Sequence, residues 1–120
     1  MSKLLVHLAT GPQDPTRAAL AFLVARTAAA AGHEVSMFLA GDAVALLREP
    51  TMEAAQGIGT GSIREHYMAL AEAGGRIYAS GMSSKARGLD ADATGGKAVE
   101  FAPPDRLVEL ILESDRVVTY

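Results

Sequence analysis

Residues 76–89 have the sequence RIYASGMSSKARGL, in which an apolar run leads directly into a small, hydroxyl-rich and basic turn. The run from Arg76 to Ser80 predicts a strand, because it is short, apolar and bounded by small residues. The turn that follows carries two cations, Lys85 and Arg87, among flexible residues. This arrangement predicts a functional site at the end of a buried strand.

Strands and helices alternate along the rest of the chain. Apolar or alternating runs predict further strands over residues 3–9, 33–40, 98–101 and 116–120. Helical patterns are found over residues 15–31, 42–47, 62–73 and 105–113. The alternation predicts one domain over residues 1–120, an α/β three-layer, flavodoxin-like sandwich with a mainly parallel sheet.

Capping residues indicate where these helices begin. Asp14 precedes Pro15, and Asp42 precedes the short helix, so each carboxylate is expected to cap free N–H groups. Ser62 and Glu65 have the spacing of a capping box. The loop over residues 57–62 has glycines at alternate positions but does not follow a strand directly, so a flexible connector is expected rather than a dinucleotide-binding loop.

The first helix, over residues 15–31, is apolar on almost every side. A helix of this kind is usually buried on more than one face. Because one sheet covers only one side of a helix, the pattern predicts a subunit interface and a homo-oligomer.

Composition excludes several classes of function. A net charge of -3 with 5% aromatic residues disfavours a nucleic-acid partner. No apolar stretch approaches the ~18 residues of a membrane span, so we expect no membrane partner and a cytoplasmic location. The chain has no cysteine, which removes disulfides, thiolate metal sites and thiol nucleophiles. We expect no cofactor.

The carboxyl ends of parallel strands are where α/β sheets gather ligands. Three predicted strands end at Thr10-Gly11, at Gly41-Asp42 and at Ser80-Gly81. We therefore expect the site at these loops. The candidate ligand-binding residues are Thr10, Gly11, Gly41, Ser80, Gly81, Ser83, Ser84, Lys85, Arg87 and Gly88.

Catalytic and metal chemistry have weaker support in the sequence. His7, His33 and His66 lack metal-ligand spacing, so no metal site is predicted. Ser80 lies outside a G-x-S-x-G motif, and no histidine and acid can be assigned to it, so no catalytic residue is assigned. Lys85 and Arg87 could hold an anion, or they could be two cations of a solvated turn.

The stretch IYASGMSSKARG, residues 77–88, resembles the DsrE/DsrF-like family of small sulfur-relay proteins. Members carry a strand, a cysteine, small residues and then an Arg-Gly pair. Arg87-Gly88 matches the pair, and counting back places Ser80 at the cysteine position. The first strand with Thr10-Gly11, the alanine-rich first helix and the tail from Phe101 are similar as well.

The resemblance implies a flavodoxin-like sandwich that assembles as trimers or hexamers. In sulfur-transferring members the cysteine carries a persulfide, which the Ser80 hydroxyl cannot form. The first hypothesis is therefore a non-catalytic oligomer that binds a small anionic ligand or a partner protein at the turn. The alternatives are an enzyme that uses Ser80 with Lys85 and Arg87, or a purely structural subunit.

Overall fold

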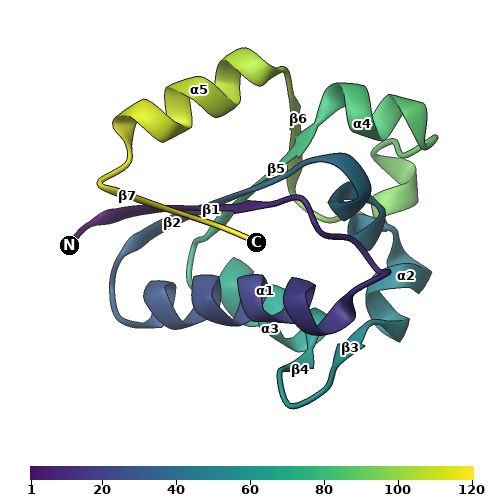
Figure 1. Ribbon diagram of the computed structural model, residues 1–120, viewed down its shortest axis with the longest axis horizontal. Helices are drawn as coiled ribbons and strands as arrows, with labels where there is room; N and C mark the ends of the chain where they lie inside the picture. The colour runs from purple at the N-terminus through teal and green to yellow at the C-terminus, as the bar shows by residue number, and fades with distance from the viewer.

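The computed structural model describes residues 1–120 and contains one five-stranded, entirely parallel sheet (Figure 1). The strands lie in the order β6-β5-β2-β1-β7. Their bounds are β1 Lys3–Leu8, β2 Glu34–Leu39, β5 Arg76–Ser80, β6 Val99–Ala102 and β7 Arg116–Thr119. The predicted strands and the α/β sandwich are thus confirmed.

Helices lie on both faces of this sheet (Figure 1). On one face lie α1 (Pro15–Ala30) and α3 (Ile63–Glu72), and on the other lies α5 (Pro104–Glu113). The shorter elements are η1 Gly41–Leu47, α2 Glu49–Ala54, β3 Gln56–Gly57, β4 Gly61–Ser62, α4 Gly81–Ala86 and η2 Asp92–Thr94. No helix combines the length and the hydrophobicity that crossing a membrane requires.

The two faces hold separate cores. The larger core lies between the sheet and α1, α2 and α3, and includes Phe22, Met37, Met52 and Leu70. The smaller core lies under α5, where Leu110 packs with Leu5, Phe38, Tyr78 and Ala102. Alternation along each strand sends successive side chains to these two cores.

The apolar character of α1 has an explanation within the chain. One side of α1, with Ala18, Phe22 and Ala25, is buried in the larger core, and α3 and the β3–β4 hairpin also pack on the helix. Leu20 is its most exposed large apolar side chain, at 37%. The predicted subunit interface on α1 was argued from the expectation that only the sheet would cover this helix. Because α3 and the β3–β4 hairpin also cover it, that argument no longer requires an interface there, and the interface stays a prediction.

The outer side of α5 carries a group of neighbouring apolar side chains that reach the surface. Val108 is 53% exposed, Ile111 39% and Leu112 80%. Their i, i+3, i+4 spacing makes them one strip along the helix. Val117, on the open edge strand β7, is 39% exposed.

Helix capping agrees with the sequence at two positions and differs at one. The Asp14 carboxylate accepts a hydrogen bond from the Arg17 N–H at 3.2 Å, and the Ser62 hydroxyl accepts one from the Glu65 N–H at 3.2 Å. Asp42, however, does not cap η1, which has no side-chain cap. Its carboxylate is engaged by a distant arginine, as described below.

Residues 57–62 are not the flexible connector that was expected. They form most of the β3–β4 hairpin, which is fastened to the start of α1. The Ile58 N–H donates to the Thr16 hydroxyl at 3.0 Å, and the Thr60 hydroxyl donates to the Thr16 carbonyl at 3.3 Å. Glycines at the turn supply the positive φ angles that the hairpin needs, at Gly59 and Gly61.

Candidate functional site

The three loops predicted to form the site lie together at the carboxyl edge of the sheet. They follow β1, β2 and β5, which are neighbours in the strand order. The loop at Gly11 lies directly against the loop at Asp42, because a Cβ on Gly11 would approach the Asp42 carbonyl oxygen to 2.4 Å. A glycine is therefore required at position 11 for this contact.

Two serine hydroxyls connect the second and third loops. The Ser80 hydroxyl accepts a hydrogen bond from the Ser83 N–H at 3.1 Å and so caps α4. The Ser83 hydroxyl accepts a hydrogen bond from the Gly41 N–H at 2.9 Å. The segment after β5, predicted as a turn, is thus a short helix whose first residues are fixed to the loop after β2.

Arg87 is committed to contacts within the chain. Its guanidinium pairs with the Asp42 carboxylate at 2.8 Å and donates to the Ser83 carbonyl at 3.1 Å. Arg48 in turn donates to the carbonyls of Arg87 and Gly88, at 3.0 and 3.2 Å. These arginines hold the loops in place, and Arg87 is not a free receptor for an anion.

Lys85, the other cation of the segment, makes no ion pair or side-chain hydrogen bond. It lies on the rim of a pocket of about 440 Å³ between α4, the segment that follows it, and β6. The residues that line this pocket are Gly81, Ser84, Lys85, Gly88, Leu89, Asp90, Ala91 and Phe101. Four of the ten candidate residues thus share one concave surface.

The other six candidates lie outside that pocket. Thr10, Gly11, Gly41, Ser80, Ser83 and Arg87 belong to the adjoining loop cluster. A second hollow of about 290 Å³ lies against the first two loops and is lined by Pro12, Gln13, Asp42 and Ala45. The loops lie together as the sequence predicted, but the sequence did not separate the residues that fix the loops from those that line a cavity.

His7 lies on β1, on the face covered by α5. Its ring meets Phe38 edge to face, with the ring centroids 6.2 Å apart. Its Nε2 atom is buried without a hydrogen-bond partner, and burial lowers the pKa of the imidazole. His7 is therefore a half-buried residue of the smaller core, as the sequence indicated.

The other two histidines contribute to local structure. His33 Nδ1 accepts a hydrogen bond from the Ser2 N–H at 3.1 Å. His66 lies between the Thr60 carbonyl, 2.6 Å from Nε2, and Arg26, 3.2 Å from Nδ1. The three histidines thus have different partners in different parts of the fold.

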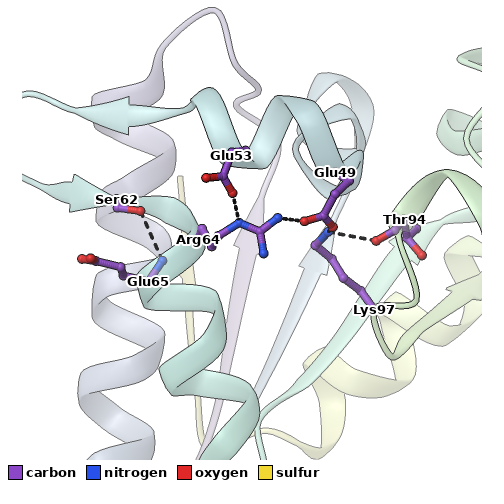
Figure 2. A network of polar contacts seen from close by, with 7 residues as sticks. All are labelled: Glu49, Glu53, Ser62, Arg64, Glu65, Thr94 and Lys97. Atoms are coloured by element: carbon purple, nitrogen blue, oxygen red, sulfur yellow. Dashed lines mark hydrogen bonds and ion pairs between the residues drawn. The ribbon is translucent and has the colours of Figure 1, made fainter.

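A polar network that the sequence did not predict joins α2, α3 and the loop before β6 (Figure 2). Arg64 pairs with both Glu49 and Glu53, and Lys97 contacts Glu49 and donates to the Thr94 carbonyl at 2.9 Å. The Lys97 side chain is only 4% exposed. Burial, and then the neighbouring Arg64 charge, lower the pKa of Lys97.

These features define a single α/β domain whose loop cluster and pocket lie at the carboxyl edge of a parallel sheet. The model of the DsrE/DsrF-like family matches residues 2–120. The chain therefore belongs to the DsrE/DsrF-like family, as a member without a cysteine. None of the proteins with curated descriptions matches this sequence.

Solved structures share the fold across almost the whole chain. The ychN protein of E. coli superposes with a TM-score of 0.82 at 18% identity, with 100% of both chains covered. Protein MTH1491 of Methanobacterium thermoautotrophicum superposes with a TM-score of 0.75 at 17% identity, also with 100% of both chains covered. Protein BT1422 of Bacteroides thetaiotaomicron superposes with a TM-score of 0.72 at 16% identity, covering 99% of this chain and 95% of that chain. Both of the latter are described as proteins of unknown function.

Proposed function

We propose that this chain is a binding member of its family, which holds a small anionic ligand beside α4 without carrying sulfur. The observation that carries the proposal is the unpaired Lys85 on the rim of a pocket in the segment that resembles the family's cysteine loop. The chain has no thiol that could form a persulfide. A binding role needs only the shape and charge of the segment.

The arrangement of the loops supports binding over nucleophilic catalysis. A catalytic serine is usually activated by an adjacent general base. The hydrogen bond made by the Ser80 hydroxyl is to the Ser83 N–H of its own helix. Ser80 then serves to hold α4 in position, and the neighbouring loops are fixed before any ligand arrives.

The test is a titration with inorganic phosphate and with sulfate, followed by the amide NMR signals of the whole chain. We expect the signals from Gly81 to Gly88 to shift. The Lys85→Gln variant should bind both anions more weakly than the parent protein. Lys3→Gln is the matched control, because Lys3 lies at the other end of the sheet. Shifts that are equal in the two variants, or absent from this segment, would count against the proposal.

Ser80→Cys tests whether this position corresponds to the family's cysteine. The new thiol would lie at the cap of α4, near Lys85 and Arg87. We expect its pKa to lie below that of an ordinary thiol, because the unpaired Lys85 charge and the free N–H groups at the start of α4 favour the thiolate. The rate of alkylation as a function of pH measures it, and an ordinary or unreactive thiol would argue against the correspondence.

Two alternatives make different predictions for the same segment. If the chain is an enzyme that uses Ser80 with Lys85 and Arg87, Ser80→Ala abolishes a measurable activity. If it is a purely structural subunit, substitutions across the segment change stability alone. If the segment binds a partner protein and not a small ligand, Lys85→Gln should weaken binding of that partner and leave phosphate binding unchanged.

We further propose that the chain assembles as a homo-oligomer through the outer strip of α5, defined above by Val108, Ile111 and Leu112. These side chains are exposed by 39% to 80% on one side of a short helix. Association buries such apolar surface. A trimer or hexamer, as the family resemblance implies, and a cytoplasmic location stay predictions.

A further inference from the structure

The pocket beside α4 has a predominantly apolar wall. Leu89 is 5% exposed and belongs to the larger core, and the half-buried Phe101 packs against that core. Ala91 completes this wall from the exposed segment after α4. At about 440 Å³ the pocket is within the usual ~300–1,000 Å³ range of small-molecule sites. A wall of this kind favours an apolar ligand body over a bare inorganic ion.

Two opposite charges line the pocket, and neither of them has an ion pair. Lys85 has no ion pair or side-chain hydrogen bond, whereas the Asp90 carboxylate keeps its charge and accepts a hydrogen bond from the Ala93 N–H at 2.9 Å. Beside the pocket, Arg87 and Asp42 neutralise one another. A ligand that places a negative group at Lys85 therefore gains an ion pair without displacing an existing one.

Ser84 contributes an unsatisfied polar group to the pocket wall. The residue is 2% exposed, and its hydroxyl oxygen has no hydrogen-bond partner in the chain. A buried hydroxyl without a partner destabilises the folded state. A rotation of the Ser84 side chain about χ1 toward the pocket would let a ligand oxygen supply the missing partner.

We propose that the pocket takes a small amphiphilic carboxylate, with an aliphatic or aromatic body against Leu89 and Phe101 and its anionic end at Lys85. In this arrangement the Ser84 hydroxyl donates a hydrogen bond to the ligand. This inference rests on the proposed function and names the ligand class for the same site. It differs from simple anion binding because the apolar body supplies most of the affinity.

The test compares four probes on the intact protein by amide NMR: hexanoate, acetate, 1-hexanol and inorganic phosphate. Each buried methylene is worth about fourfold in affinity, so hexanoate should bind at least tenfold more tightly than acetate even with partial burial. Hexanoate should also bind several-fold more tightly than 1-hexanol, because only the carboxylate pairs with Lys85. The signals of Gly88, Leu89 and Ala91 should shift.

Two variants separate the apolar contact from the ionic one. Ala91→Trp fills the pocket from an exposed position with ordinary helical backbone angles, φ -59° and ψ -38°, and should remove binding of hexanoate and 1-hexanol. Ala71→Trp, at an exposed position on α3, is the matched control. Lys85→Gln should lower the affinity for hexanoate to that for 1-hexanol and leave the affinity for 1-hexanol unchanged. If Ala91→Trp does not fold, Ala91→Leu takes its place.

Ser84→Ala gives a readout that does not depend on the pocket being filled. Removing the unpaired hydroxyl should raise the Tm of the free protein by about 3–5 °C and weaken hexanoate by several-fold. A lower Tm would mean that the hydroxyl is satisfied in solution and would remove its role here.

The outcomes distinguish this inference from the function on which it rests. If hexanoate binds no more tightly than acetate, or if Ala91→Trp binds it normally, the amphiphile site is overturned. Phosphate binding that depends on Lys85 would then still support the proposed function. If hexanoate binds in a manner that depends on Ala91 but not on Lys85, the ionic contact is wrong and the inference fails as stated.

Discussion

On one face of the sheet, 21 buried hydrophobic residues pack beneath α1, α2 and α3, whereas on the other only five buried residues lie beneath α5. The first face is closed within the chain, since α1 is covered by both the sheet and α3 (Figure 1). The second face has a single helix, whose outer strip of Val108, Ile111 and Leu112 reaches solvent.

The difference shows that hydrophobicity along a helix does not by itself determine how much apolar surface the helix leaves exposed to solvent. The alanine-rich α1 is the more apolar helix, yet its neighbours in the same chain cover most of it. α5 alternates apolar with charged residues and still exposes more large apolar side chains. The apolar surface that a helix leaves exposed depends on how many neighbouring elements of the same chain pack against it.

The largest expected effect comes from matched leucine truncations on the two faces. Leu70 on α3 is 0% exposed and Leu110 on α5 is 3% exposed. Leu70→Ala should lower the free energy of unfolding by about 4 kcal/mol, because the deep core cannot collapse around the cavity. Leu110→Ala should cost about 2–3 kcal/mol, since α5 can settle onto the sheet. Urea denaturation measures both, and equal losses would break the comparison.

The polar network at the edge of the closed face should give the next effect (Figure 2). Glu49→Gln leaves Arg64 and the buried Lys97 without their shared carboxylate. We expect a loss of about 2 kcal/mol in the free energy of unfolding, below the figure for deeply buried pairs because Glu49 is 43% exposed. Glu53→Gln, at 68% exposure on the same arginine, is the control and should cost less than about 0.5 kcal/mol. Similar losses for the two variants would mean that Lys97 does not depend on Glu49.

A pH dependence should arise on the thinly covered face. Burial lowers the pKa of His7 below its ordinary value of 6.5, so between these two pKa values the unfolded chain binds more protons than the folded one. The His7 contribution should therefore destabilise the fold as the pH falls through 6.5, and should level off below the folded pKa.

His7→Gln removes that contribution. The difference in unfolding free energy between the parent and this variant should vary between pH 7.5 and pH 5, with the parent losing more. His33→Gln is the control, because His33 is exposed and immediately precedes β2. A difference that stays constant with pH would contradict the burial of His7.

The smallest effect on stability should come from the outer strip of α5. Leu112→Ser, at 80% exposure, should change the free energy of unfolding by less than about 0.5 kcal/mol, yet it should reduce self-association in sedimentation velocity. Leu20→Ser on α1 is the matched control and should leave association unchanged. The reverse result would return the interface to α1, and a monomeric parent would contradict the assembly itself.

The sequence predicted the elements well because their signals are local. Asp14 and Ser62 were identified as helix caps from their immediate neighbours, and both accept the expected N–H groups. The carboxyl ends of β1, β2 and β5 were predicted to form one site, and the strand order places them side by side. Whether the ten candidate residues bind a ligand stays a prediction.

The features that were missed depend on residues far apart in the chain. Asp42 was expected to cap a helix, but Arg87, 45 residues away, pairs with its carboxylate. Lys97 lies in a polar, glycine-rich loop, yet its side chain is buried and its amine contacts Glu49, 48 residues away. Neither partner can be identified from spacing, because only the folded sheet brings them together.

The pairing of β7 with β1 has a consequence for synthesis on the ribosome. β1 is made first and β2 and β5 soon after, but the other edge of β1 stays unpaired until residues 116–119 arrive. At ~5–20 residues per second, the 39 residues from Ser80 to Thr119 take about 2–8 s. Throughout that interval the nascent chain exposes one backbone edge of β1, the apolar strand next to the central β2, where chaperones or neighbouring nascent chains can pair with it.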